Sequence, residues 1–318
     1  MSKKRIMLLV AITLAAVVLA PYLTSRVLSP SRRVTDRSNV SVDEENPDDP
    51  TRLRVCCYNI AHGRGLAKSN WEGGGEEERV QRLKDIAKQI REIDADIVVL
   101  NEVDFDTSWS HGVNQAEYLA REAGYRYWKE QRNLDCRVLT WKWRFGNALL
   151  SRLPVSDATS IDLPALSEFE SWVAGRKRAF YCDVAVGDQW LRVVAAHLSH
   201  RSEPIRDESA KMLVALAAES PHPVVIGGDL NSTPPGFPRS GSTADGNNAI
   251  ATLDASELFQ RRPTEPPQPQ ELTFSVDDPR SVIDWILIPA QWRFESYRAI
   301  DCDLSDHRPV VADVLIGD

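Results

Sequence analysis

The spacing of apolar residues along the chain follows two patterns, and each predicts a different kind of element. From Glu78 to Ile93 the apolar residues fall on one stripe at helical spacing, which predicts an amphipathic helix. The stretch Ile205–Glu219 predicts a second helix and Ala116–Ala123 a third. Short, largely apolar runs predict buried strands. These runs are Arg54–Tyr58, Asp96–Leu100, Asn147–Leu150, Phe180–Val186, Leu191–Ala196, Val224–Ile226, Val282–Ile288 and Val310–Leu315.

The order of these elements favours a single α/β domain. Strands and helices alternate, but several strands follow one another directly, which indicates a mixed sheet rather than an all-parallel one. Two long segments, Arg132–Phe145 and Thr233–Glu271, fit neither pattern. Both therefore predict long surface loops, the second with a short helix near Ile250–Leu258.

The N-terminal segment has a pattern of its own. A basic cluster, Lys3-Lys4-Arg5, precedes the uncharged stretch Ile6–Leu23, which at about 1.5 Å per residue is just long enough to cross a bilayer. A secretory signal peptide has a similar pattern, so two alternatives stay open. The chain is either membrane-anchored with its body outside the cytoplasm, or secreted or periplasmic after cleavage. The predicted parts are an anchor or signal segment (1–27), a polar linker (28–50) and one large domain (51–318).

The net charge of −8 hides an uneven distribution. Residues 1–37 carry seven basic residues and one acidic residue, a charge of +6, so the remainder carries −8 − 6 = −14. An acidic body weighs against a protein that holds nucleic acid through its overall field, although it is compatible with a local basic groove.

The five cysteines, at positions 56, 57, 136, 182 and 302, form no C-x-x-C pair, so no zinc site is predicted. Cys56 and Cys57 are neighbours in a predicted strand and should face opposite sides of its sheet. Two alternatives stay open for the cysteines: buried thiols, or one disulfide that includes Cys136.

Polar side chains follow the apolar runs at the points where several predicted strands end. Strand ends are where open α/β sheets place their chemistry, so these side chains are expected to share one site. The polar residues at these ends are Asn59, Glu102, His197, Asp229, Asn231, Asp284, Asp306 and His307.

The chemical types of these residues suit phosphate chemistry around a hard metal ion. Glu102 and Asp306 are candidate ligands for Mg²⁺, with Mn²⁺ as a substitute and Asp104 as a spare ligand. His197 and His307 are candidates for proton transfer and for stabilising an anionic transition state.

Three further residues are expected to support this chemistry. Asp284 is a candidate to orient the ring of His307 and to favour its charged form. Asp229 can hold or deprotonate a water molecule and Asn231 can bond a phosphate oxygen. The two should point to the same side if their strand persists.

Six ordered motifs together resemble the endonuclease/exonuclease/phosphatase superfamily over residues 53–316. The resemblance implies a four-layer α/β sandwich with two mixed β-sheets packed face to face and helices outside. It also implies hydrolysis of a phosphoester by in-line attack of water, which makes 51–318 the catalytic domain. The motifs are YNIAHGRG, DIVVLNEVD, FGNALLSRLPV, VVAAHLSH, VIGGDLNSTP, and RSVIDWILIP followed by SDHRPVVADV.

The resemblance also implies roles for individual residues. Glu102 is similar to the main metal ligand of the superfamily, Asp306 to the acid that completes the metal site and Asn59 to the amide that supports metal and phosphate. Asn147 resembles an amide that contacts the phosphate or supports the site.

The resemblance assigns the hydrolytic step to a second group of residues. Asp229 resembles the residue that orients or deprotonates the water, with Asn231 beside it on the phosphate. Asp284 resembles the partner of His307, whose ring contacts the scissile phosphate. His197 resembles a histidine that assists the leaving group in the nuclease and sphingomyelinase branches and is lacking in the abasic-site branch.

The leading hypothesis is a Mg²⁺-dependent phosphodiesterase whose substrate is a phospholipid headgroup or a nucleic acid. A secreted or membrane-tethered nuclease is the alternative. A hypothesis of another class is a tethered module that binds without turnover, against which the complete acid and histidine set argues. Trp141 and Trp143 could insert into a lipid interface, stack on bases or simply pack. No obligate protein partner is predicted.

Overall fold

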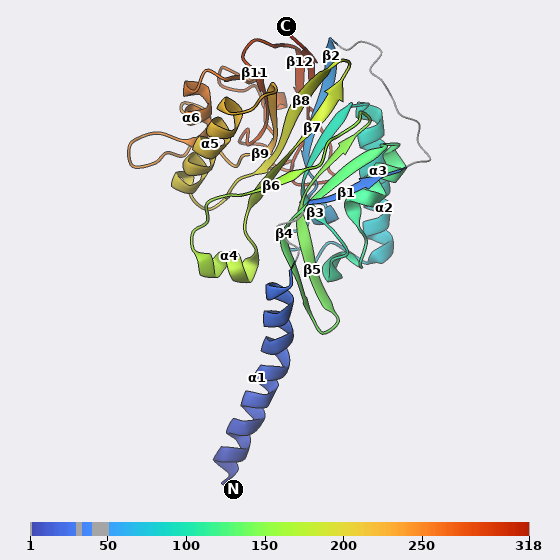
Figure 1. The fold of residues 1–318 in the computed structure, drawn as a ribbon, viewed down its shortest axis with the longest axis vertical. Coiled ribbons are helices and arrows are strands. Elements are labelled where there is room, and N and C mark those ends of the chain that lie inside the picture. The colour runs from blue at the N-terminus through green and yellow to red at the C-terminus, as the bar shows by residue number, and fades with distance from the viewer. Residues whose placement is uncertain (1, 30–33, 40–50, 318) are drawn as a thin grey trace.

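Two mixed β-sheets pack face to face, and helices cover their outer faces, as Figure 1 shows. The computed structural model describes residues 2–29, 34–39 and 51–317. One sheet has the strand order β1-β4-β5-β3-β2-β13-β12 and the other β10-β11-β9-β8-β7-β6. The predicted four-layer α/β sandwich is confirmed.

The first sheet contains β1 (Val34–Ser38), β2 (Arg52–Asn59), β3 (Ile97–Asp104), β4 (Tyr127–Val138), β5 (Trp141–Ser151), β12 (Arg293–Ala299) and β13 (Val310–Leu315). The second contains β6 (Thr159–Asp162), β7 (Arg178–Val186), β8 (Gln189–His197), β9 (Val224–Asp229), β10 (Phe259–Gln260) and β11 (Asp284–Pro289). The α-helices are α1 (Lys3–Val27), α2 (Glu76–Ile93), α3 (Gln115–Ala123), α4 (Glu168–Ala174), α5 (Glu203–Ala218) and α6 (Ala249–Ala255). Three 3₁₀ turns complete the described elements: η1 (Ala61–Gly63), η2 (Ser108–Ser110) and η3 (Pro269–Glu271).

Side chains that alternate along each strand divide the core into three apolar layers. One layer lies between the first sheet and helices α2 and α3, a second between the two sheets, and a third between the second sheet and helices α5 and α6. Cys56 belongs to the first layer and Cys57 to the second, so the prediction that they face opposite sides is confirmed. All five thiols are free, which excludes a disulfide in this structure.

The strand register brings the polar strand ends together. At the centre of each sheet two strands run parallel, β2 with β3 and β8 with β9. Their register places Asn59 opposite Asn101, and His197 opposite Asp229. On its other side Asp229 lies opposite Asp284 of β11. The two facing sheets therefore offer their polar ends at one edge of the sandwich.

The prediction of a surface loop over Arg132–Phe145 is wrong, because this stretch belongs to the hairpin of β4 and β5. Its charged side chains conceal the strand pattern. Asp135 and Arg144 are cross-strand partners joined by a 3.0 Å ion pair, while Leu134 and Cys136 are buried. The charged side chains pair with one another across the two strands, so a stretch rich in charged residues can still form a sheet.

Other departures from the predicted elements lie at sheet edges. The expected linker 28–50 contains β1, which pairs with β4, whereas 30–33 and 40–50 lie outside the described residues. Strands β6 and β12 pass unnoticed in the sequence because they are short or largely exposed edge strands without an apolar run. Within Thr233–Glu271 the predicted short helix is present as α6.

Helix α1 projects from the sandwich at the end that carries α4 and the tip of the β4–β5 hairpin (Figure 1). It is 25 residues long, has no buried residue and reaches a mean hydropathy of 2.6 over its most apolar window. Within the described residues it is the one helix long and apolar enough to cross a membrane, a test that a signal sequence also passes.

Candidate active site

The backbone turns sharply where the polar strand ends meet. The pairing of β3 with β5 shifts register between Leu100 and Val103, and Glu102 in this bulge adopts a left-handed conformation with φ of 51°. Asn231 and His62 have φ of 51° and 54°. Left-handed backbone in a non-glycine residue is costly, and β-bulges re-aim side chains. Several such residues at one place therefore indicate a site selected for its geometry.

Asp229, at the end of β9, lies at the centre of the cluster. Its Oδ2 accepts a hydrogen bond from Asn59 Nδ2 at 3.1 Å and lies 3.5 Å from His197 Nε2 and 3.8 Å from His307 Nε2. The backbone N–H of Asp229 donates to Asn101 Oδ1 at 2.8 Å. Burial raises the pKa of the Asp229 carboxyl, against the attraction of the nearby His307. A buried carboxylate with a raised pKa is suited to accept a proton near neutral pH.

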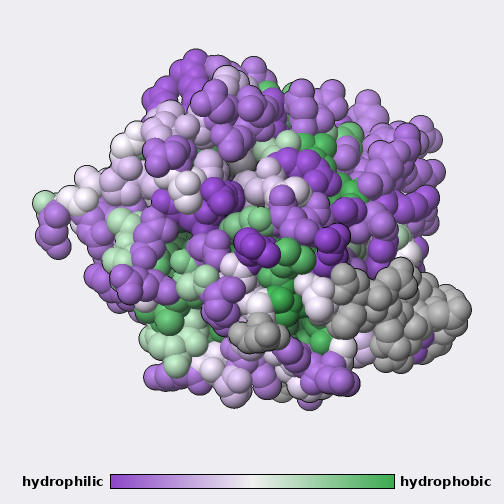
Figure 2. Space-filling view, turned by 90° about the horizontal axis from the view of Figure 1, so that it is seen from above, coloured by the Kyte–Doolittle hydropathy of each residue, from purple (hydrophilic) through white to green (hydrophobic). Residues whose placement is uncertain are grey.

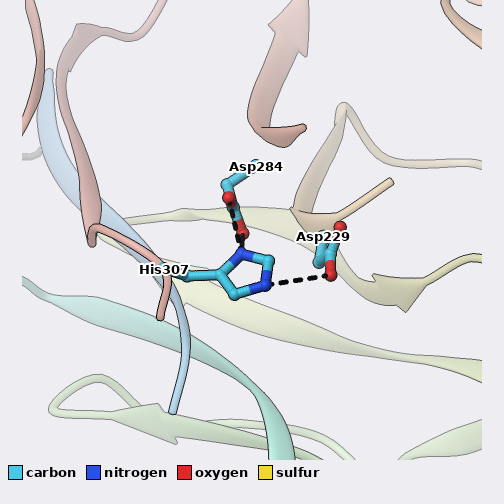
Figure 3. A group of neighbouring side chains, drawn as sticks. All are labelled: Asp229, Asp284 and His307. Atoms are coloured by element: carbon cyan, nitrogen blue, oxygen red, sulfur yellow. Dashed lines mark hydrogen bonds and ion pairs between the residues drawn. The ribbon is translucent and has the colours of Figure 1, made fainter. Parts of the chain in front are cut away.

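Asp284 and His307 form a buried pair beside Asp229, as Figure 3 shows. The ring Nδ1 of His307 lies 2.9 Å and 3.1 Å from the two carboxylate oxygens of Asp284, and Phe274 packs on the ring at 4.6 Å. Burial alone would lower the pKa of His307, but the charges of Asp284 and Asp229 outweigh it and raise the pKa to about 10. The ring is therefore held as an imidazolium with Nε2–H directed at the cluster centre.

Glu102 and Asp306 face each other across the guanidinium of Arg64. Arg64 Nη1 lies 3.2 Å from Glu102 Oε2, and Arg64 Nη2 lies 2.6 Å from Asp306 Oδ2. Both carboxylates are about one-quarter exposed. Burial alone would raise the pKa of Glu102, but the surrounding cationic groups, His62 first, hold it well below its usual range.

This arrangement fits a divalent cation between Glu102 and Asp306. Their oxygens are hard ligands, Glu102 remains ionised, and a cationic group already bridges the two. Asp229, Asp284 and His307 are also spaced closely enough to hold an ion.

His62 adds a third imidazole to the site. Its Nδ1 bonds the buried Asp104 at 2.7 Å, and its Nε2 lies 3.5 Å from Glu102. Burial alone would lower the pKa of His62, but the charge and hydrogen bond of Asp104 raise it. Asp104, the expected spare ligand, is thereby engaged as the partner of His62 and also accepts from Trp109 Nε1 at 2.7 Å.

Lys177 contacts His197, which borders Asp229 in the cluster. Its Nζ lies 2.7 Å from Nε2 and 3.1 Å from Nδ1 of His197. Burial lowers the pKa of Lys177, and burial together with the adjacent Lys177 lowers the pKa of His197 well below its usual range. The lowered pKa values make Lys177 a readier proton donor, and His197 a weaker base, than the same side chains in water.

Two predicted residues have supporting positions. Asn147 is fully buried and hydrogen-bonds Gln131, the backbone oxygen of Arg178, and Asn101 Nδ2 at 2.9 Å. It thereby holds Asn101, which holds the backbone of Asp229. Strand β9 ends at Asp229, so the condition for Asn231 to point to the same side is not met. Its Nδ2 instead bonds Leu198 O at 3.3 Å.

The structure also brings in residues that the sequence did not single out. His62 and Arg64 lie inside the motif YNIAHGRG and Asn101 inside DIVVLNEVD, so a polar residue within a motif was the available signal. Lys177 lies between α4 and β7 in a segment without a recognisable motif. Only the fold places it against His197.

A cleft of about 250 Å³ opens over these side chains. Glu102, His62 and Lys177 contribute to its polar lining, and Phe145 and Leu166 contribute apolar walls. The charged groups of the lining suit the phosphate of a phosphoester, and the apolar walls suit its substituent.

Comparisons with known proteins agree with this geometry. Residues 56–307 match the model of the endonuclease/exonuclease/phosphatase family. No curated protein matches the chain. An endonuclease/exonuclease/phosphatase from Beutenbergia cavernae DSM 12333 has a similar structure, with a TM-score of 0.62, 21% identity, and coverage of 84% of this chain and 72% of its own.

Two further similar structures come from named enzymes. The mannosyl-6-phosphatase of Bacteroides thetaiotaomicron aligns with a TM-score of 0.60 and 16% identity over 83% of this chain and 100% of its own. Sphingomyelinase C from Streptomyces griseocarneus aligns with a TM-score of 0.54 and 18% identity over 82% of this chain and 99% of its own. At these identities the similarity establishes the fold.

Proposed function

Because the chain belongs to the endonuclease/exonuclease/phosphatase family, we propose that it is a Mg²⁺-dependent phosphodiesterase, with Mn²⁺ as a substitute metal. The family consists of hydrolytic phosphoesterases, which supports hydrolysis of a phosphoester. The observation that carries the proposal is the position of Asp229. Its Oδ2 lies within 3.8 Å of Asn59, His197 and His307, in a buried cluster beside the cleft.

In this proposal Asp229 orients the attacking water and accepts its proton. A raised pKa makes the carboxylate a better base than an exposed aspartate, and the Asn59 amide fixes Oδ2 in place. The Asn101 hydrogen bond to the Asp229 backbone, itself supported by Asn147, limits movement of the base. The backbone N–H of Asn231 donates a hydrogen bond to Asp229 Oδ1 at 2.9 Å, which holds the second carboxylate oxygen in place.

His307 stabilises the charge that develops on the phosphate. Its imidazolium donates from Nε2 to a non-bridging phosphate oxygen, while Asp284 holds Nδ1 and keeps the ring charged. We assign the leaving oxygen to Lys177 and His197, because Lys177 Nζ lies 2.7 Å from His197 Nε2 and that nitrogen lies 3.5 Å from Asp229 Oδ2. Lys177 offers a positive charge there, and His197 a proton relay from Lys177 to the leaving group.

Glu102 and Asp306 would hold the metal ion, with Asn59 next to them. A bound Mg²⁺ supplies Lewis-acid stabilisation of the phosphate charge. Arg64 bridges these two carboxylates, and its guanidinium would pair with the phosphate if it left that position.

We also propose that α1 anchors the enzyme in a membrane, with the N-terminus cytoplasmic and the catalytic domain outside. The basic cluster Lys3-Lys4-Arg5 ahead of the apolar run supports this orientation. If α1 is instead a cleaved signal peptide, the same domain is secreted or periplasmic.

The test is metal-dependent turnover by the full chain in detergent. The substrates are bis(p-nitrophenyl) phosphate, p-nitrophenyl phosphate, plasmid DNA, single-stranded RNA and sphingomyelin vesicles. Glu102→Gln should abolish Mg²⁺-dependent turnover. Asp183→Asn is the matched control, because Asp183 pairs with Arg192 at 2.8 Å far from the cluster. No Mg²⁺- or Mn²⁺-dependent hydrolysis of any ester would overturn the proposal, and turnover of the monoester alone would change it to a phosphatase.

A further inference from the structure

Exposed apolar side chains of the domain gather around the mouth of the cleft. They come from three segments: the loop before α2, the tip of the β4–β5 hairpin, and the α4 region. We call them the apolar rim, and each is between 38% and 75% exposed. The rim consists of Trp71, Leu139, Trp141, Leu166, Phe169 and Trp172. Among the described residues of the domain, the other exposed large apolar side chains are Leu66, Trp190, Met212 and Leu258.

A continuous series of aromatic rings joins the rim to the active site. His62, which contacts Glu102, packs against Phe145 at 5.4 Å and Trp109 at 5.9 Å. Trp109 packs against Trp71 at 5.9 Å, and Trp71 against Trp141 at 5.4 Å. Leu166, another residue of the rim, lines the cleft itself. The rim is therefore the outer edge of the cleft.

Helix α1 ends against the same rim. Tyr22 packs edge-on against Trp172 at 5.2 Å, and its hydroxyl donates to Trp172 O at 3.2 Å. Arg26 Nε donates to the same oxygen at 2.8 Å, and the backbone N–H of Arg137 in the hairpin donates to Ser25 Oγ at 2.7 Å. Two of the three segments of the rim, the α4 region and the hairpin, thus contact the last turns of α1.

These contacts fix the height of the rim relative to a bilayer. The uncharged run of α1 ends at Leu23, so the contacting residues lie where the helix would leave the hydrocarbon layer. Tryptophan and tyrosine prefer that level, since their rings are apolar and their N–H or O–H groups reach water. In Figure 1 α4 and the hairpin tip lie at the end of the sandwich from which α1 projects, whereas Figure 2 shows a mainly hydrophilic surface with some apolar patches on the face seen from above.

We infer that the apolar rim rests on the membrane in which α1 is anchored, and that the cleft opens onto the lipid surface and takes phosphoesters carried by lipids. The substrate part of this inference rests on the proposed phosphoesterase function. A bilayer accounts for the exposed apolar side chains, the level of Tyr22 and Arg26 along α1, and the position of the rim beside the cleft. A nucleic acid accounts for none of the three, and the part of the chain after residue 37 carries a charge of −14.

Tryptophan fluorescence tests the docking without any need for activity. All nine tryptophans lie between Trp71 and Trp292, so α1 contributes no signal. The full chain is reconstituted into phosphatidylcholine vesicles with bromine atoms near the headgroup end of the acyl chains. We expect partial quenching, a smaller quenched fraction in Trp141→Ala, and no such reduction in Trp190→Ala. Trp190 is the matched control because it is 44% exposed, close to the 47% of Trp141, and lies near the start of β8, outside the apolar rim. Equal quenched fractions in the two variants, or no quenching of the unsubstituted protein, would overturn the docking.

Hydrolysis tests the substrate. In the double variant Trp141→Ala/Phe169→Ala, release of water-soluble phosphate ester from vesicles of phosphatidylcholine, phosphatidylglycerol or sphingomyelin should fall at least tenfold. Its turnover of bis(p-nitrophenyl) phosphate should stay within twofold of that of the unsubstituted protein. Trp190→Ala should leave both unchanged. If the protein is quenched but hydrolyses only nucleic acid or the synthetic ester, the lipid substrate is refuted and the docking on the membrane still stands. If no ester is hydrolysed, the proposed phosphoesterase function is refuted. The quenching experiment then tests the docking by itself.

Discussion

Replacing Asp284 by asparagine removes a charge from the active site with little change of shape. In the unsubstituted protein His307 Nδ1 lies 2.9 Å from an oxygen of Asp284. The amide oxygen of asparagine can still accept this hydrogen bond, so the ring keeps its orientation. What is lost is the negative charge that does most to keep the buried imidazole protonated. The substitution therefore changes the charge of the His307 ring while the position of the ring is kept.

The expected loss of activity follows from the proposed role of that charge. A donor or a proton-transfer group in a reaction of this type contributes about 10²–10⁴-fold. We expect kcat/KM to fall at least 100-fold, which corresponds to about 2.7 kcal/mol of transition-state stabilisation. Breaking a buried ion pair costs about 3–5 kcal/mol of stability, and because Asp229 stays 3.8 Å from the ring we expect about 2–3 kcal/mol here.

The pH dependence of this loss has a definite sign. The pKa of His307 is raised to about 10, above its ordinary value of 6.5. A raised histidine pKa stabilises the fold fully below 6.5, and this stabilisation is lost as the pH rises through 10. The difference in unfolding free energy between the unsubstituted protein and Asp284→Asn should thus be largest near pH 6 and shrink toward pH 10.

Urea unfolding at several pH values and hydrolysis of bis(p-nitrophenyl) phosphate measure the two effects on the full chain. Asp183→Asn, which loses a partly buried ion pair with Arg192 outside the cluster, should retain activity within about twofold. If Asp284→Asn folds and keeps more than half of its activity, the charge on His307 takes no part in the reaction.

Three other substitutions test separate parts of the structure. Glu102→Gln keeps the size of the side chain but removes a hard anionic ligand, so Mg²⁺-dependent turnover should fall more than 100-fold, and the protein should no longer bind Mn²⁺ in an electron paramagnetic resonance titration. Lys177→Met should lower turnover about 10- to 100-fold and raise the pKa of His197 toward its ordinary value, measured by NMR titration of the ring, because the adjacent charge that helps to lower it is gone. Gly228→Ala places a Cβ 2.0 Å from the backbone oxygen of Ala196 at a φ of 137°, and should lower the unfolding free energy by about 3 kcal/mol in a urea titration.

Each of these results has a control or an outcome that contradicts it. Unimpaired Mn²⁺ binding by Glu102→Gln would place the metal elsewhere. An unchanged rate in Lys177→Met would make its contact with His197 purely structural. Gly75→Ala has a φ of −72° and no atom within 4 Å of its new Cβ, so it should be nearly neutral, and a Gly228→Ala variant as stable as Gly75→Ala would refute the steric argument.

The sequence predicted the central strands and their polar ends because both follow from short-range pattern. Buried strands such as Ile97–Asp104 combine an apolar run with a polar terminus. The sequence did not predict the contacts between these ends, since the partners of Asp229 lie up to 170 residues away along the chain. Lys177 was missed for the same reason: its role comes from the position of His197, twenty residues later, and local pattern does not encode that position.

The β4–β5 hairpin, which the sequence predicted as a loop, links the site to the apolar rim. Along β5 the side chains pass from exposed Trp141, through Phe145 in the cleft wall, to buried Asn147 beneath the cluster. A strand rises about 3.3 Å per residue, so Trp141 lies about 13 Å along the strand from Phe145 and about 20 Å from Asn147. The ladder with β4 holds these positions in one register. If the rim rests on a bilayer, the hairpin therefore sets the height of the cleft above it, and shortening the exposed end of β5 would change access to a lipid phosphate without changing the chemistry at Asp229.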